Sequence, residues 1–84
     1  MTDYRRKQIE HKAKHFVANV EESIKGLDLA DQIQEVEAHQ NHFGKKIDGM
    51  SLEQLAEPYG WEYYKKYTGM TDLLGVLYEQ AEII

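Results

Sequence analysis

The chain has 84 residues, no cysteine and a net charge of −5, which bounds it to one small domain. The lack of cysteine excludes disulfides and thiolate metal sites, and the acidic balance disfavours general binding to nucleic acid. No apolar stretch approaches the roughly 20 residues of a membrane span, so we expect a cytoplasmic protein with no membrane partner.

The first predicted helix covers residues 3–25 and ends at Gly26. Its apolar residues recur at intervals of three and four, which is typical of one buried helical face. They are Ile9, Ala13, Phe16, Val17, Val20 and Ile24. This segment is also the basic part of the chain, since residues 1–19 hold five bases and two acids, whereas residues 20–84 hold five bases and thirteen acids.

The second predicted helix covers residues 29–43, between an N-cap at Asp28 and a stop at Gly44. Its seam repeats at intervals of four and three residues and includes one polar position. The seam consists of Leu29, Ile33, Val36, Gln40 and Phe43. Because only a short link joins the two helices, we expect residues 1–43 to form an antiparallel hairpin.

The sequence "KKIDG", residues 45–49, is the one clear predicted loop, and a third helix over residues 51–59 follows it. Ser51 and Gln54 have the spacing of a capping box, which marks the start of this helix. Gly60 is expected to break the helix at its other end.

Two further helices are predicted after this break. A short aromatic helix covers residues 61–67, and a last helix covers residues 71–83, with an interruption at residues 68–69. The apolar residues of the last helix are Leu73, Leu74, Leu77 and Ile84.

These elements predict the fold class and the domain organisation. The fold class is all-α, a small four-helix domain built on an antiparallel helical hairpin. The chain forms a single helical domain over residues 1–84, with the hairpin at residues 1–43 and the capped short helices with their aromatic cluster at residues 51–84.

The start of the third predicted helix resembles a DNA-binding motif. The sequence "SLEQLAEPYGW" resembles the first helix and turn of a helix-turn-helix, because Ala56 and Gly60 match its small residue and its turn glycine. The following helix departs from the motif, since core positions fall on Lys66 and Gly69 and no Arg, Asn or Gln is present to contact bases. A helix-turn-helix-like transcriptional regulator acting through residues 51–69 is therefore the alternative prediction.

Five aromatic residues within nine positions make the leading candidate site. They cannot all face one small core, and Tyr and Trp are enriched in the hot spots of protein interfaces. We predict an interaction face for another protein, with two lysines at its rim: Tyr59, Trp61, Tyr63, Tyr64, Lys65, Lys66 and Tyr67. The competing interpretation buries Tyr59, Trp61 and Tyr64 and leaves the other two tyrosines singly exposed.

Acidic residues of the second predicted helix form a weaker candidate surface. Asp31, Glu35 and Glu37 carry negative charge on this helix, and such a group can complement a basic partner. Any partner contact here is predicted from charge alone.

Two histidine pairs have helical spacing, His11 with His15 and His39 with His42. Both pairs are predicted to point away from the buried faces of their helices, so no metal site within the monomer is expected. A metal site that histidines of two chains build together at an oligomer contact remains an alternative.

The chain shows no catalytic pattern. It has two serines, no glycine-rich phosphate loop and no carboxylate pair in an acid–base setting, so we expect neither an enzyme nor a cofactor. The leading prediction is a small accessory, regulatory or inhibitory protein that binds another protein. A homo-oligomer that buries the aromatic residues in its own interface is a third interpretation.

Overall fold

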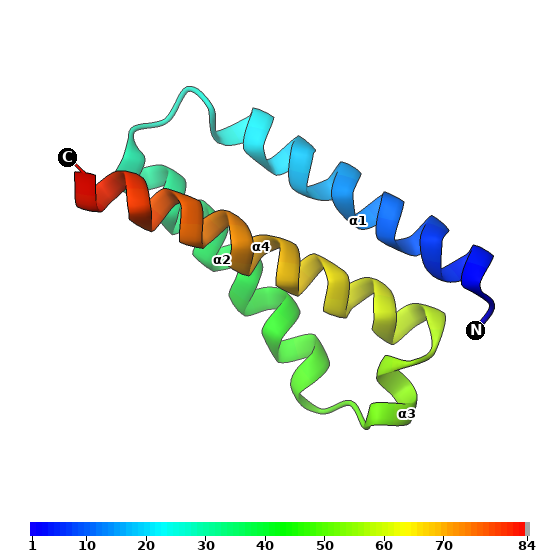
Figure 1. Ribbon diagram of the computed structural model, residues 1–84. Helices are drawn as coiled ribbons and strands as arrows, with labels where there is room; N and C mark the ends of the chain where they lie inside the picture. Colours follow the sequence, from blue (N-terminus) through cyan, green and yellow to red (C-terminus); the bar gives the residue numbers. More distant parts are fainter. Residues whose placement is uncertain (84) are drawn as a thin grey trace.

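The protein consists of three long helices and a single-turn helix, and the computed structural model describes residues 1–83 (Figure 1). In chain order the helices are α1 (Asp3–Ile24), α2 (Leu29–Asp48), α3 (Leu52–Leu55) and α4 (Pro58–Ile83). The predicted all-α, four-helix class is confirmed for this part of the chain. Ile84, which the sequence assigned to the apolar face of the last helix, lies outside the described residues.

Helix α4 occupies the centre of the fold. The helices α1 and α2 run in opposite directions, as expected for a hairpin, but both pack mainly on α4 and little on each other (Figure 1). The molecule is elongated, with a longest extent of 43 Å. One end contains α3 and the starts of α1 and α4, and we call it the α3 end; the C-terminal end of α4 lies near the α1–α2 connection (Figure 1).

Side-chain caps fix the starts of α2 and α3. Asp28 Oδ1 accepts a hydrogen bond from the Asp31 amide at 2.9 Å, which satisfies one of the unpaired donors of the first turn. At α3, the Ser51 amide donates to Gln54 Oε1 at 2.8 Å, and the Gln54 amide donates to Ser51 Oγ at 3.2 Å. Both predicted caps are therefore confirmed.

The predicted end of the second helix at Gly44 is wrong. Helix α2 continues through Gly44 to Asp48, so most of the predicted loop over residues 45–49 is helical, and Gly49 follows as the cap. Gly44 lies where α2 approaches α4, since a Cβ atom there would be 3.2 Å from Tyr67 Cε2. The lack of a side chain at Gly44 thus allows α2 and α4 to pack closely. The stabilisation from this packing exceeds the cost of glycine's low helix propensity.

The predicted breaks at Gly60 and at residues 68–69 are also wrong, because α4 is one continuous helix. Pro58 is its first residue, where the missing amide donor has no helical partner to lose. A Cβ atom at Gly60 would overlap the carbonyl group of Gln54, and one at Gly69 would lie 2.5 Å from Val17 Cγ2. Both glycines therefore allow a neighbouring element to approach α4 closely.

The hydrophobic core lies between α4 and the two other long helices. Met70 on α4 and Val36 on α2 have no exposed surface. The buried cluster consists of Val20, Ile24, Val36, Phe43, Met70, Leu74 and Leu77. The polar position of the α2 seam, Gln40, is accommodated because its Nε2 donates to Thr71 Oγ1 on α4 at 2.9 Å. Because one side of α4 is buried in this core, the other side of the helix is the one that faces solvent.

Candidate functional site

The aromatic residues of α4 divide into two groups on different sides of the helix. Tyr59, Tyr63 and Tyr67 are spaced four residues apart and form a row that faces α2. Tyr63 and Tyr67 are half-buried and pack against the core, with the Tyr63 ring centroid 5.9 Å from that of Phe43. Tyr59, at the start of the row, is 61% exposed. We call these three residues the α2-facing row.

The second aromatic group is a stacked pair. The rings of Trp61 and Tyr64 lie 5.6 Å apart at an interplanar angle of 29°, on the side of α4 that faces α3 and the start of α1. They line a groove of about 340 Å³, which we call the Trp61 groove. Its walls are Arg6, Leu52, Leu55, Ala56, Trp61 and Tyr64.

The burial pattern of the aromatic residues is a correction to the competing interpretation of the sequence. That interpretation buries Tyr59, Trp61 and Tyr64 and exposes Tyr63 and Tyr67, whereas the structure places Tyr63 and Tyr67 against the core and leaves Tyr59 61% and Tyr64 37% exposed. Trp61 is half-buried. The reason is the position of α2, which covers the side of α4 that carries Tyr63 and Tyr67. The five rings therefore do not form one continuous face.

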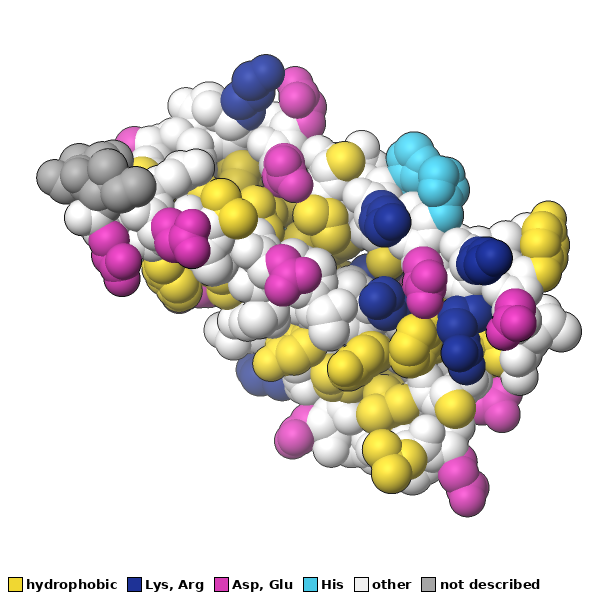
Figure 2. Space-filling model, in the orientation of Figure 1, with side chains coloured by type: hydrophobic (Ala, Val, Ile, Leu, Met, Phe, Trp, Pro, Cys, Tyr) yellow, Lys and Arg dark blue, Asp and Glu magenta, His cyan; other side chains and the backbone are white. Residues whose placement is uncertain are grey.

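Leu52 is the most exposed large hydrophobic residue of the described chain, at 86% exposure. The capping box that begins α3 holds this residue in the first turn, and the close approach at Gly60 fixes α3 against α4. Hydrophobic side chains gather over α3 and the first half of α4, and Lys and Arg side chains border them (Figure 2). The sequence did not identify Leu52, because its exposure depends on α3 being a single turn that ends at Leu55.

Two cations lie over the Trp61 ring. The Arg6 guanidinium carbon is 5.2 Å from the ring centroid and Lys65 Nζ is 5.6 Å from it, which is within the range of cation–π attraction. The Trp61 Nε1 atom is buried and has no hydrogen-bond partner among residues 1–83. Arg6 is a second site residue that the sequence did not identify, because Arg6 and Trp61 belong to helices that are far apart in the sequence.

The two adjacent lysines of α4 have different surroundings. Lys65 borders the Trp61 groove, whereas the Lys66 side chain is only 19% exposed and lies between α1 and α2. Its Nζ is 5.1 Å from the Phe16 ring centroid, 5.9 Å from the Phe43 centroid and 3.9 Å from Glu62 Oε1. Lys66 thus contributes to the packing of the three long helices and is not part of the groove rim.

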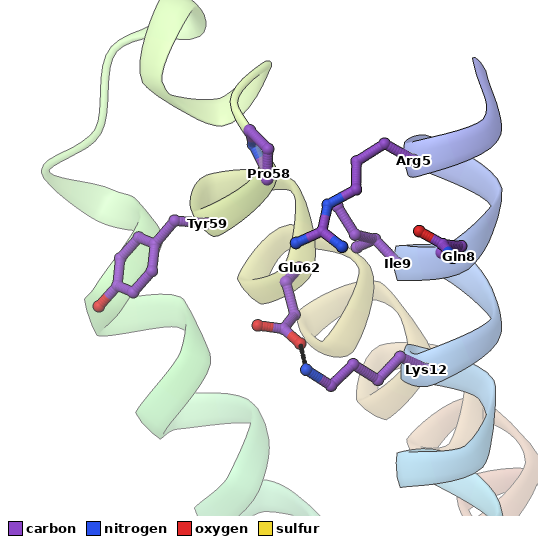
Figure 3. A pocket seen from close by; sticks show the side chains of 7 residues that line it. All are labelled: Arg5, Gln8, Ile9, Lys12, Pro58, Tyr59 and Glu62. Atoms are coloured by element: carbon purple, nitrogen blue, oxygen red, sulfur yellow. Dashed lines mark ion pairs between the residues drawn. The ribbon is translucent and has the colours of Figure 1, made fainter. Parts of the chain in front are cut away.

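A second hollow lies on the other side of the contact between α1 and α4, and we call it the Arg5 cleft (Figure 3). It has a volume of about 490 Å³ and is lined by Arg5, Gln8, Ile9, Lys12, Pro58, Tyr59 and Glu62. Arg5 extends from α1 toward the first turn of α4 (Figure 3). An ion pair of 3.0 Å between Lys12 Nζ and Glu62 Oε1 bridges the two helices across this cleft.

The acidic residues of α2 lie far from the aromatic groups. Asp31 and Glu35 are exposed on the first half of α2, near the end of the molecule opposite the α3 end. Glu37 is half-buried, and its Oε1 accepts a 2.6 Å hydrogen bond from the Tyr78 hydroxyl of α4. This bond raises the pKa of Tyr78 above its ordinary value of 10.0, with a further contribution from desolvation. These acids therefore do not belong to the same surface as Trp61.

The four histidines differ in their surroundings. His11 and His15 are exposed on α1, with their Nε2 atoms 3.0 Å apart. The His39 ring packs edge-on against Phe16, and the exposed His42 ring packs against Phe43. The expectation that both pairs are fully solvated is therefore wrong for His39, which is half-buried. No group of three or more His, Cys, Asp or Glu side chains within residues 1–83 is arranged to hold a metal ion.

The positions that resemble a helix-turn-helix are arranged differently from that motif. Ala56 is the C-cap of the single-turn α3, whereas the motif has its small residue in the middle of a helix. Gly60 lies inside α4, whereas the motif has its glycine in the turn. The chain between the two helices is limited to residues 56–57.

Comparisons of the chain with protein-family models, with curated proteins and with solved structures give no match. Within the described residues, no helix combines the length and the hydropathy needed to cross a membrane. The features of the molecule that bear on its function are therefore the Trp61 groove, the Arg5 cleft and their charges.

Proposed function

We propose that this protein is a small non-enzymatic accessory or regulatory protein of the cytoplasm that binds another protein through the Trp61 groove, an inhibitor being one form of such a role. The observation that carries the proposal is the Trp61 groove, in which the exposed Leu52 and Tyr64 side chains border the half-buried Trp61 ring. Exposed apolar surface bordered by polar residues is typical of protein interaction sites.

The residue types of the groove favour a protein partner. Trp, Tyr and Arg are the side chains most enriched in interface hot spots, and the groove brings together Trp61, Tyr64 and Arg6. The stack and the two overlying cations restrict the Trp61 ring before any partner binds. Such preorganisation reduces the entropy lost when a partner associates.

The charge around the groove favours an acidic partner segment. Arg6 and Lys65 border the groove and Arg5 lines the adjacent cleft, so this end of an acidic protein presents cations. Lys12 of the cleft is already paired with Glu62. An amphipathic helix with apolar residues three or four positions apart and acids beside them complements both features. We therefore propose an acidic amphipathic helix as the occupant of the groove.

Duplex DNA receives less support as the occupant. Lys66, one of the few basic residues of residues 51–69, is engaged with Phe16, Phe43 and Glu62 and contributes little free charge. Glu62, in the second turn of α4, also faces α1, and its carboxylate opposes contact with a phosphate group there. The remaining cations at this end are too few for strong phosphate binding.

The test is a selection of helical peptides from a phage-displayed library on the wild-type protein, with affinities then measured by calorimetry. We expect selected peptides to combine apolar and acidic residues and to bind at least about tenfold more weakly to a variant with Leu52→Ala and Tyr64→Ala. A matched control, Val76→Ala, removes an exposed apolar side chain near the opposite end of α4 and should leave the affinity unchanged.

Three results would overturn the proposal. Selected peptides that bind the double variant as well as wild type would place the site elsewhere. Concentration-dependent dimerisation in sedimentation experiments that Leu52→Ala with Tyr64→Ala abolishes would identify a second copy as the occupant. A steep, salt-reversible change of Trp61 fluorescence on addition of duplex DNA, lost in Lys65→Ala, would identify DNA as the ligand.

A further inference from the structure

Two imidazole rings converge on the solvent face of α1. His11 Nε2 and His15 Nε2 are 3.0 Å apart, and the ring centroids are 4.5 Å apart with an interplanar angle of 81°. Both residues are exposed. We propose that His11 and His15 form a bidentate site for a divalent transition-metal ion of the Cu²⁺ or Ni²⁺ class.

The separation of the two nitrogen atoms determines which metal geometry fits. With metal–nitrogen bonds of about 2.0–2.1 Å, a nitrogen separation of 3.0 Å corresponds to a ligand–metal–ligand angle of roughly 95°. An angle near 90° is that of neighbouring ligands in square-planar or octahedral complexes, which Cu²⁺ and Ni²⁺ prefer. A tetrahedral Zn²⁺ ion requires a wider separation, about 3.3–3.4 Å for the same bond lengths.

The helix holds the two ligands in place before a metal binds. α1 is continuous from Asp3 to Ile24, and Ile9 and Ala13 anchor its opposite face in the protein interior. Residues four apart on a helix lie one above the other, so His11 and His15 need no backbone movement to chelate an ion.

The hydrogen bond between the rings is replaced when the metal binds. Without metal, the Nε2–H group of one ring donates a hydrogen bond to the Nε2 atom of the other across 3.0 Å. With metal, both Nε2 lone pairs point toward the ion, and each neutral ring carries its single proton on Nδ1. The ring that donated the hydrogen bond therefore changes tautomer: its proton leaves Nε2 and a proton is taken up on Nδ1, so both rings stay neutral and no net proton is released.

The lysine between the two histidines does not occupy the site. Lys12, which lies between the two histidines in sequence, points away from them to form its ion pair with Glu62. No third His, Cys, Asp or Glu completes a cluster within the described residues. The other coordination positions of the ion are therefore filled by water or by a group from another molecule.

The second histidine pair provides a matched control within the same chain. His39 and His42 are three residues apart on α2, and their rings pack against Phe16 and Phe43. Both pairs have the same ligand type and both lie on long helices. They differ in that only His11 and His15 bring two Nε2 atoms to chelating distance.

The experiment is a calorimetric titration of Cu²⁺ ions into the wild-type protein, with electron paramagnetic resonance of the bound ion. We expect one ion per chain with hyperfine coupling to two imidazole nitrogens, and His11→Gln or His15→Gln should weaken binding on the order of 100-fold, because the second ligand then no longer binds intramolecularly. A variant with His39→Gln and His42→Gln should bind as wild type does.

A stability measurement distinguishes chelation of Cu²⁺ by both histidines from weak, nonspecific Cu²⁺ binding. Because the chelating geometry exists only in the helix, Cu²⁺ should raise the thermal midpoint of wild type and of the His39→Gln, His42→Gln variant, but not that of His11→Gln. Circular dichroism without metal should be the same for all variants. Equal Cu²⁺ affinity in wild type and in His11→Gln with His15→Gln, or a spectrum with one nitrogen ligand only, would overturn the proposal.

Discussion

The two aromatic groups of α4 have similar composition and opposite surroundings. Tyr63 and Tyr67 of the α2-facing row are half-buried and pack against the core. Trp61 and Tyr64, on the other side of the same helix, stack on each other and line an open groove. The rings belong to one stretch of nine residues, so residue type and sequence position alone do not distinguish a core ring from a binding ring.

The difference arises from what faces each side of α4. A 20-residue helix, α2, covers the first side and approaches closely at Gly44. Only the single-turn α3 and the start of α1 face the second side, and they are too short to cover it. An aromatic pair that meets an incomplete helical layer remains accessible to a partner.

The largest expected effect is a difference in the free energy of unfolding between variants of the two aromatic groups. Tyr67→Ala should lower the free energy of unfolding by about 2–3 kcal/mol, since it removes a ring that packs on the core and on Gly44. Tyr64→Ala should lower it by less than about 1 kcal/mol, because this ring is partly exposed. Urea denaturation followed by circular dichroism measures both. Equal losses would show that the two groups do not differ in the way the structure indicates.

An intermediate effect on stability is expected from substitution of Gly60, the glycine at the contact between α3 and α4. Gly60→Ala should lower the free energy of unfolding by about 1–3 kcal/mol and loosen α3, because the added Cβ atom overlaps the Gln54 carbonyl group. Gly75→Ala is the matched control, since nothing lies within 4 Å of its Cβ position. It should raise the stability by up to about 1 kcal/mol through helix propensity. Chemical denaturation tests the pair, and a stabilising Gly60→Ala would contradict the close α3–α4 contact.

The smallest effect concerns a tyrosine outside both groups. The pKa of Tyr78 is raised by its hydrogen bond to Glu37, so the protonated phenol is favoured in the folded protein. The stability that this bond contributes is present below pH 10, the ordinary tyrosine value, and is lost as the pH rises through the higher pKa of the folded state.

An ultraviolet titration of the tyrosines measures this shift. Tyr78→Phe should remove a phenolate transition that wild type shows above pH 10, and Glu37→Gln should move that transition to lower pH. If Tyr78→Phe removes only a transition near the ordinary tyrosine pKa of 10.0, and Glu37→Gln shifts no transition, the Tyr78–Glu37 bond is absent in solution.

Much of the fold follows from local signals in the sequence. The apolar periodicity of α1 and the caps at Asp28 and Ser51 are short-range features, and all are confirmed. Three glycines were interpreted as helix ends or breaks, although each lies inside a helix: Gly44, Gly60 and Gly69. A glycine that ends a helix and a glycine that allows another helix to approach closely cannot be distinguished from the local sequence. Only the position of the neighbouring element distinguishes them.

The candidate site was predictable in part. Helical geometry places Trp61 and Tyr64 on one side of the helix, and they do stack. It does not say which side of α4 faces the core, because that depends on the position of α2. The contributions of Arg6 and Leu52 to the groove depend on where α1 and α3 lie relative to α4, so no local pattern reveals them.

The central position of α4 also affects how the chain folds during synthesis. Because α1 and α2 pack mainly on α4, the first 48 residues have no stable surface on which to bury their apolar faces until the last third of the chain has left the ribosome. The nascent hairpin exposes Val36 and Phe43 during that interval. Final docking is therefore expected only after α4 has left the ribosome, and chaperone contact before that point is expected on the inner faces of α1 and α2.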